Sequence, residues 1–214
     1  MKYDLVIFDM DGTILNTLED LADSLNVTLR HFGYPEHTIS EVCSFVGNGI
    51  RLLIERGVPE GLSTEQIDEV YAYFMKYYQQ HCADKTKPYE LIPETIMKLR
   101  QKGVKTAVLS NKADCAVREL AEQYFKGLFD VAVGEREGVS KKPAPDGVDD
   151  ILRQLQVDRN KAVYIGDSEV DIATAKNAHM DSIIVKWGFR KADFLRSQGA
   201  KILIDSPEEI LKYC

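Results

Sequence analysis

The sequence of 214 residues predicts an α/β fold in which a parallel sheet carries helices on both faces and an all-helical segment is inserted after the first strand. Three observations lead to this prediction. Short apolar runs rich in β-branched residues alternate with helical patterns from about residue 90 onward. The first run, residues 5–8, is apolar throughout, as in a strand that is covered on both faces. Residues 16–83 contain no convincing strand and several amphipathic stretches.

Six strands are expected in the core. They are the runs at residues 5–8, 106–109, 131–133, 162–165, 183–185 and 202–204. Helical patterns lie between them, among them residues 94–102, which Gly103 ends, and residues 169–178. This βαβ series predicts a Rossmann-like parallel sheet whose crossovers are right-handed.

The inserted segment is expected to form a helical cap domain. Apolar residues recur there at the spacings of three and four that one helix face requires, namely Leu18, Leu21, Ala22, Leu25 and Leu29. Residues 63–66 have the form of a capping box, and an apolar stripe continues to Tyr78. Residues 46–49 read as a tight turn or a helix interruption. We therefore expect a catalytic core of residues 1–15 and 84–214, with residues 16–83 as a lid over the strand ends.

The acidic composition of the chain limits the kinds of molecule that it is expected to bind. Asp and Glu total 34 against 27 Lys and Arg, and the formal net charge of -7 opposes non-specific attraction to nucleic acid or anionic membranes. The apolar runs are far shorter than the roughly 20 residues that span a bilayer, and no signal-peptide pattern is visible. We expect a cytoplasmic protein that binds a small charged metabolite. The four cysteines show no metal-ligand spacing, and the oligomeric state cannot be read from the sequence.

Polar residues follow four predicted strands at the point where each strand ends, which is where open α/β sheets bind ligands. Asp9 and Asp11 follow the first strand, and two carboxylates so close repel each other unless a cation or a shared proton relieves them. Mg²⁺ is the natural partner for such a pair. Ser110 and Asn111 follow the second strand and offer a hydroxyl and backbone N–H groups to phosphate oxygens near a helix N-terminus.

The other two strand ends add a cation and a second pair of acids. Lys141 and Lys142 precede Pro143 and offer a point charge to a phosphoryl group. Asp167 and Asp171 are one helical turn apart, so they lie on the same side of a helix. Each motif alone also fits an ordinary structural role, as a helix cap, a solvated basic turn or a charge that complements a helix dipole. Their combination at successive strand ends predicts phosphoryl transfer.

The order of these motifs resembles that of the haloacid dehalogenase superfamily. The Asp-x-Asp-Gly-Thr run ending in Gly12 and Thr13, the Ser-Asn pair, the Lys-Pro pair and the Gly-Asp-x-x-x-Asp run starting at Gly166 stand in family order. The resemblance implies that Asp9 is the nucleophile that forms an aspartyl-phosphate, and that Asp11 is the general acid and then the base.

The resemblance also implies a Mg²⁺ ion held by the Asp9 carboxylate, the Asp11 main-chain carbonyl and Asp167, with Asp171 in support. Ser110, the amide of Asn111 and Lys142 would bind the transferring oxygens. Lys142 is preferred to Lys141 because it directly precedes Pro143, although the two roles could be exchanged. Gly12, Thr13 and Gly166 are supporting positions of the motifs.

Within the superfamily, residues 16–21, 46–49 and 110–112 resemble phosphoglycolate phosphatases, so hydrolysis of a small phosphomonoester is the expected reaction. Asp11 favours phosphatases and phosphomutases, since dehalogenases lack an acid at that position. A sugar phosphomutase of the β-phosphoglucomutase type and an inorganic pyrophosphatase remain alternatives. A receiver-type phosphoacceptor domain is the alternative from another class, and Asp11 and the helical insertion argue against it.

Two further residues are left open. Arg51 either reaches a substrate anion or belongs to a surface helix. Asn16 stands at a hinge position where related phosphatases commonly carry Asp, which leaves the details of cap closure in doubt. Trp187 and Gly188 are expected to form a loop near the site without a chemical role.

Overall fold

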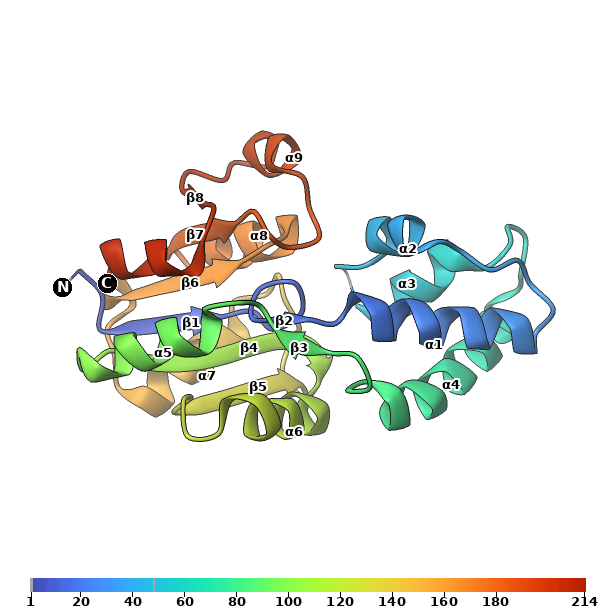
Figure 1. Cartoon of the computed structure of the whole chain (residues 1–214), viewed down its shortest axis with the longest axis horizontal. Coiled ribbons are helices and arrows are strands. Elements are labelled where there is room, and N and C mark those ends of the chain that lie inside the picture. Colours follow the sequence, from blue (N-terminus) through green and yellow to red (C-terminus); the bar gives the residue numbers. More distant parts are fainter. Residues whose placement is uncertain (1, 48) are drawn as a thin grey trace. The chain divides into compact units, whose positions relative to one another are not determined.

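The computed structural model describes residues 2–47 and 49–214 (Figure 1), so Asn48, within the predicted interruption at 46–49, lies outside the described residues. The chain forms two compact units. One contains residues 1–15 and 88–214, and the other contains residues 16–87. The short strands β2 (Leu15–Asn16) and β3 (Lys87–Pro88) pair with each other where the chain leaves and re-enters the larger unit. This pairing explains why the insertion ends at residue 87, whereas the sequence suggested residue 83.

The larger unit is built on a six-stranded sheet with the strand order β5-β4-β1-β6-β7-β8. Its strands are β1 (Leu5–Phe8), β4 (Lys105–Ala113), β5 (Val131–Glu135), β6 (Ala162–Gly166), β7 (Asp181–Val185) and β8 (Leu203–Ile204). All neighbouring pairs are parallel. The predicted α/β class is confirmed, and β1 lies at the centre, with Phe8 opposite Val108 of β4 and Ile165 of β6.

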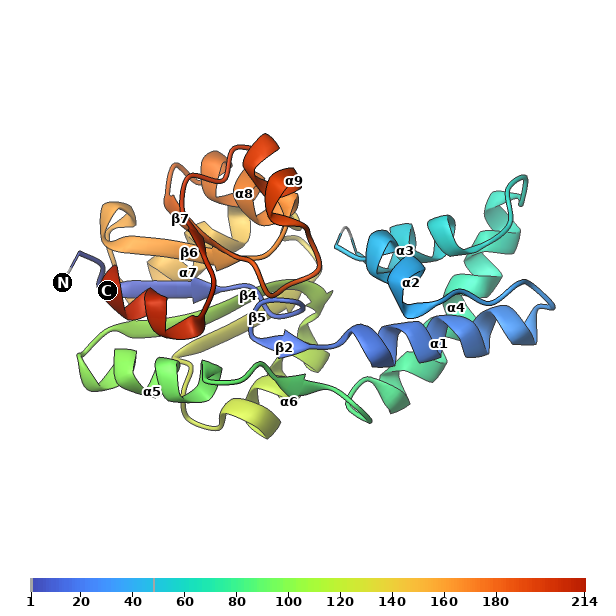
Figure 2. The ribbon, with the colours of Figure 1, turned by 45° about the horizontal axis from the view of Figure 1, so that its top comes forward.

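Helices cover both faces of this sheet (Figures 1 and 2). Helices α7 (Asp146–Leu155) and α8 (Glu169–Asn177) pack on one face, where Leu5 and Ile7 of β1 join the core. Helices α5 (Ile92–Gln101) and α6 (Asp114–Phe125) cover the other face, where Phe8 makes an edge contact with Phe129. Successive side chains of a strand point to opposite faces, so this double cover explains why β1 is apolar at every position.

The smaller unit is a bundle of α1 (Leu18–His31), α2 (Ile39–Phe45), α3 (Ile50–Gly57) and α4 (Thr64–His81). The predicted apolar stripe of α4 is buried at Val70, Phe74 and Tyr78. The predicted capping box is present, because the Gln66 N–H donates to Ser63 Oγ and the Ser63 N–H donates to the Gln66 side chain. In the described part of the chain, no helix combines the length and apolarity needed to cross a membrane.

The second strand is longer than expected. The sequence ended it at residue 109, whereas β4 continues through Ser110 and Asn111 to Ala113, directly before α6 starts at Asp114. The strand is prolonged because Ala113 still pairs with Glu135 of β5 after a register shift, and Asp114 accepts a hydrogen bond from the Gly134 N–H at 2.8 Å. The remaining short elements are α9 (Ala192–Ser197) and the 3₁₀ helices η1 (Arg159–Lys161) and η2 (Pro207–Lys212).

Candidate functional site

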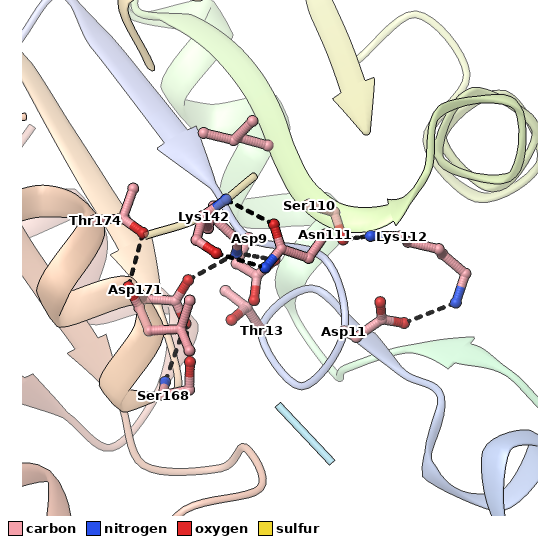
Figure 3. Close-up of polar contacts among 12 residues, drawn as sticks. Asp9, Asp11, Thr13, Ser110, Asn111, Lys112, Lys142, Ser168, Asp171 and Thr174 are labelled. Atoms are coloured by element: carbon pink, nitrogen blue, oxygen red, sulfur yellow. Dashed lines mark hydrogen bonds and ion pairs between the residues drawn. The ribbon is translucent and has the colours of Figure 1, made fainter. Parts of the chain in front are cut away.

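Asp9 lies at the carboxyl end of the central strand, in the middle of a cluster of charged side chains (Figure 3). Its backbone N–H donates to the carbonyl of Ile165 at 2.8 Å, which continues the pairing of β1 with β6 past the end of the strand. Its carboxylate is buried and lies 2.7 Å from Nζ of Lys142. The sheet therefore fixes the position of the predicted nucleophile.

Lys142 is a buried cation that joins two of the carboxylates. Its Nζ is 2.7 Å from Asp9 Oδ1 and 2.8 Å from Asp171 Oδ1. The Asn111 side chain holds the backbone of this lysine, because the Lys142 N–H donates to Asn111 Oδ1 at 2.8 Å and Asn111 Nδ2 donates to the Lys142 carbonyl at 3.0 Å. Lys141 is exposed. Of the two lysines that the sequence left open, only Lys142 contacts Asp9 in the described residues.

Asp171 caps α8 and also belongs to the cluster. Its Oδ2 accepts hydrogen bonds from the Ser168 hydroxyl at 2.7 Å, the Ser168 N–H at 3.1 Å and the Asp167 N–H at 3.2 Å. Its Oδ1 lies 2.8 Å from Lys142 and 3.3 Å from the Tyr164 hydroxyl. The sequence offered a charge that complements the helix dipole as the structural role of Asp171, whereas this fully buried carboxylate both closes the capping box of α8 and contacts Lys142.

Asp167 follows β6 and is held by two other segments of the chain. The Phe189 N–H donates to its Oδ2 at 2.7 Å, and the Thr13 hydroxyl lies 3.5 Å from its Oδ1. The indole N–H of Trp187 donates to the Thr13 carbonyl at 3.0 Å. The segment after β7, which the sequence placed near the site, therefore orients both the loop after Asp9 and the Asp167 carboxylate, and these contacts were not predicted.

Glycines allow the backbone to approach these carboxylates closely. Gly12 has a φ of +83°, and a Cβ there would lie 2.5 Å from Asp167 Oδ2. A Cβ on Gly188 would lie 2.3 Å from the Cβ of Asp167, and one on Gly166 would lie 2.2 Å from the Cγ of Asp171. Any other residue at these positions would displace a carboxylate of the cluster.

Asp11 takes part in a separate ion pair. Its Oδ1 lies 3.1 Å from Nζ of Lys112, and the side chain of this lysine is 5% exposed. The backbone N–H of Lys112 donates to Ser110 Oγ at 3.2 Å. In Figure 3 the pair is drawn on the opposite side of Asp9 from Asp171 and Ser168. The structure therefore places the two aspartates of the first motif in different charged environments.

Three buried carboxylates could hold a metal ion. Asp9, Asp167 and Asp171 each offer an oxygen, and these oxygens all lie within 4.8 Å of one another. Burial, with the charge of Asp171 adding to it, raises the pKa of Asp9 well above its ordinary value and raises the pKa of Asp167 to about 7. Burial opposes the charged form of Lys142 as well, but Asp171 and Asp9 outweigh it and raise the pKa of this ammonium. A divalent cation with a preference for oxygen ligands would relieve the remaining repulsion, so the residues fit such an ion.

The sequence matches a known family over most of its length. The family described as haloacid dehalogenase-like hydrolase is matched by residues 6–185. The chain belongs to the haloacid dehalogenase-like hydrolases. The resemblance inferred from the four motifs is thereby confirmed.

Relatives of this hydrolase cover nearly the whole chain. It is 32% identical to the phosphoglycolate phosphatase of Aquifex aeolicus, over 97% of this chain and 95% of the relative. It is 31% identical to a candidate pyrophosphatase of Caldanaerobacter subterraneus, over 99% of this chain and 94% of the relative. A solved structure of a candidate phosphoglycolate phosphatase from Lactobacillus delbrueckii is 40% identical and superposes with a TM-score of 0.94, covering 98% of this chain and 97% of that one.

Arg51, which the sequence left open as a substrate contact of this hydrolase, is paired within the helical unit. Its guanidinium donates to Glu55 at 2.8 Å and also to Asp68, and it lies over the ring of Tyr71. Its positive charge is therefore engaged by neighbouring carboxylates of α3 and α4. This arrangement favours the surface-helix interpretation.

Proposed function

We propose that this hydrolase is a Mg²⁺-dependent phosphatase that cleaves a small phosphomonoester, with phosphoglycolate as the leading candidate. The observation that carries the proposal is the convergence of Lys142 with Asp9 and Asp171, at 2.7 and 2.8 Å, beside Asp167 at the carboxyl edge of the sheet. A buried nucleophile, a fixed cation and carboxylates for a metal ion are the parts that phosphoryl transfer needs. Relatives named phosphoglycolate phosphatase support the choice of substrate.

In this proposal Asp9 attacks the phosphorus atom in line and forms an aspartyl-phosphate. Lys142, Ser110 and the backbone amide of Asn111 bind the transferring oxygens and stabilise the charge that they carry in the transition state. Asp11 gives its proton to the leaving oxygen. It then takes a proton from the water that hydrolyses the intermediate.

Asp9, the main-chain carbonyl of Asp11 and Asp167 would hold Mg²⁺, with Asp171 in support. The ion would offset the repulsion between the anionic nucleophile and the anionic phosphate. Asp171 fits a supporting role because both of its oxygens already accept hydrogen bonds or contact Lys142, which leaves them committed to positioning neighbouring groups. Gly12, Thr13 and Gly166 act by keeping the carboxylates in place.

The helical unit of residues 16–87 is proposed to act as the cap that selects the organic part of the substrate. The phosphate is then recognised by the larger unit, and specificity depends on the inserted helices.

The proposal is tested by comparing phosphoglycolate, pyrophosphate and β-glucose 1-phosphate as substrates, each with and without Mg²⁺. We expect Mg²⁺-dependent release of phosphate, with the highest kcat/KM for phosphoglycolate. Asp9→Asn should abolish turnover while circular dichroism and the melting temperature remain close to those of the wild type. Wild-type-like rates in the Asp9 variant, or equal rates without a divalent ion, would overturn the proposal.

Pyrophosphate hydrolysis is the second candidate, because the relative from Caldanaerobacter subterraneus is named as a candidate pyrophosphatase and is 31% identical to this chain. A higher kcat/KM for pyrophosphate than for phosphoglycolate would select it. A phospho-Asp9 that lasted for many minutes would instead favour a receiver-type signalling role.

A further inference from the structure

Lys112 is a buried cation for which the proposed reaction has no role so far. Lys112 is 7% exposed, and a lysine is almost never buried without a charged partner. Its Nζ lies 3.1 Å from Oδ1 of Asp11, and the Asp11 side chain is 22% exposed. Burying an ammonium group costs free energy, so we looked to the contact with Asp11 for the role of this lysine.

We propose that Lys112 is the positioning residue of the acid/base Asp11, and that its contribution appears in the proton-transfer steps and not in phosphate binding. The inference deepens the proposed function and rests on it, since it takes Asp11 as the acid and base. Lys112 does not need to touch the substrate for this role, because it acts through the carboxylate of Asp11.

The two buried lysines of the candidate site contact different carboxylates. Lys142 contacts Asp9 and Asp171, whereas Lys112 contacts Asp11, and Figure 3 draws the two pairs on opposite sides of Asp9. Lys112 is also tied to the phosphate-binding residue Ser110 through its backbone N–H, at 3.2 Å. The position of Asp11 is thus fixed relative to the end of β4, the same strand end that offers Ser110 and Asn111 to the phosphate.

The two proton transfers define what this contact does. In the first step the bond between an Asp9 oxygen and phosphorus forms, the ester P–O bond breaks, and the proton of Asp11 moves to the ester oxygen, which leaves as an alcohol. Asp11 is then a carboxylate opposite the Lys112 ammonium. In the second step water attacks phosphorus, one of its protons moves to Asp11, and the bond to Asp9 breaks to release phosphate. Holding Asp11 at one place serves both steps.

The test separates proton transfer from phosphate binding by the choice of leaving group. p-Nitrophenolate leaves without a proton, so a pre-steady-state burst from p-nitrophenyl phosphate reports formation of the phosphoenzyme without the acid. An alkyl phosphate needs the proton of Asp11, because its leaving group is an alcohol. The alkyl phosphate used is the one with the highest kcat/KM among the substrates compared above. Lys112→Met keeps an unbranched stem of similar length, and Lys126→Met, on an exposed side chain of the same unit, is the matched control.

In Lys112→Met we expect the burst rate and the KM for both substrates to stay within about threefold of wild type. We expect kcat for the alkyl phosphate, and the steady-state rate after the burst, to fall by about tenfold or more. In the background of Asp11→Asn, adding Lys112→Met should cause no further loss, because residues that act as a unit are not additive. Lys126→Met should match the wild type.

Three outcomes would overturn the inference. The first is an equal loss of the burst and of alkyl phosphate turnover, which would mean that Lys112 binds phosphate or supports the fold generally. The second is a raised KM with kcat unchanged. The third is full additivity of the two substitutions. None of these bears on the proposed function, which instead fails if wild-type enzyme shows no metal-dependent turnover.

Discussion

At the scale of single residues, the candidate site contains three buried carboxylates and one lysine that contacts two of them. Backbone N–H groups donate hydrogen bonds to carboxylate oxygens of Asp167 and Asp171. Lys142 pairs with Asp9 and Asp171 and favours their charged forms. Burial and the charge of Asp171 outweigh this effect, so the pKa values of Asp9 and Asp167 are raised. The folded protein without metal therefore binds protons at these carboxyl groups more tightly than the unfolded chain does. Protons and a divalent cation compete for the same oxygens.

The first prediction concerns pH. The pKa of Asp167 is about 7 in the folded protein, against 3.8 for a free aspartate side chain, so between these values the folded state holds a proton that the unfolded state has lost. The metal-free protein should therefore lose stability as pH rises through this window, and the raised pKa of Asp9 acts in the same direction. Added Mg²⁺ should raise the melting temperature more at about pH 8 than at about pH 5.

Thermal melts in EDTA and in Mg²⁺ across this pH range check the prediction. In Asp167→Asn the carboxyl group is gone, so the fall in stability with rising pH should be smaller and the Mg²⁺ effect weaker. A stabilisation by Mg²⁺ that is equal at both pH values would contradict the role of these carboxylates as metal ligands.

The second prediction concerns Gly188. A Cβ at this position would lie 2.3 Å from the Cβ of Asp167, so Gly188→Ala should displace the carboxylate that the Phe189 N–H orients. We expect the Mg²⁺ concentration for half-maximal activity to rise by about tenfold or more. A Mg²⁺ titration of activity measures it.

The control for that variant is Gly103→Ala. Gly103 has a φ of +81° and open space around it, so alanine there should cost stability through backbone strain without changing the Mg²⁺ titration. Equal shifts of the Mg²⁺ dependence in both variants would show that loss of stability, and not displacement of Asp167, is the cause.

Residue types and their order along the chain selected the acids, the serine and the lysine of the candidate site, because these groups carry their proposed chemistry in the side chain. Phe189 and Trp187 could not be found in this way. Phe189 acts through its backbone N–H, and Trp187 reaches the carbonyl of Thr13 from the other end of the sequence. The sequence placed the loop of Trp187 and Gly188 near the site, but it did not predict which groups this loop contacts.

At the scale of elements, the carboxyl ends of β1, β4 and β6 bring the charged groups together. The capping box of α8 fixes the orientation of the Asp171 carboxylate. Short apolar runs rich in β-branched residues predicted all six strands of the sheet. They could not predict the extension of β4 to Ala113, because Ser110, Asn111 and Lys112 are polar residues that pair only where β5 lies beside them. The boundary of the insertion was missed for a similar reason, since β2 and β3 are each two residues long.

The third prediction compares two serine caps. Ser63 is the N-cap of α4 in the helical unit and makes a capping box with Gln66, whereas the Ser168 hydroxyl donates to Asp171 within the charged cluster. Ser63→Ala should lower the free energy of unfolding by about 1 kcal/mol and leave kcat unchanged. Ser168→Ala should lower both the stability and kcat, because Asp171 loses a donor that fixes its orientation.

Urea unfolding and steady-state kinetics on both variants measure these effects. The same loss of kcat in the two variants would mean that stability alone governs activity. An unchanged kcat in Ser168→Ala would show that the remaining donors hold Asp171 without the hydroxyl.

At the scale of the whole molecule, a chain with a formal net charge of -7 is proposed to bind an anionic substrate. The positive charge for this purpose is local: Lys142 and Lys112 are both buried at the carboxyl edge of the sheet, among carboxylates that a divalent cation would neutralise. The net charge opposes binding of polyanionic partners, but it says nothing about such a local arrangement. The family and the fold follow from the motifs and their order, whereas in our proposal the choice of substrate depends on the inserted helices.

The most direct test of the account is to trap the intermediate. Asp11→Asn should still allow the attack by Asp9 on a phosphomonoester with a good leaving group but should slow the attack by water, so a phosphoenzyme accumulates. Incubation of this variant with p-nitrophenyl phosphate and Mg²⁺, followed by peptide mass spectrometry, should place the phosphoryl group on Asp9. The adduct should be absent with EDTA and in the Asp9→Asn, Asp11→Asn double variant. A phosphoryl group on any other residue, or an adduct that forms equally without a divalent ion, would contradict the account.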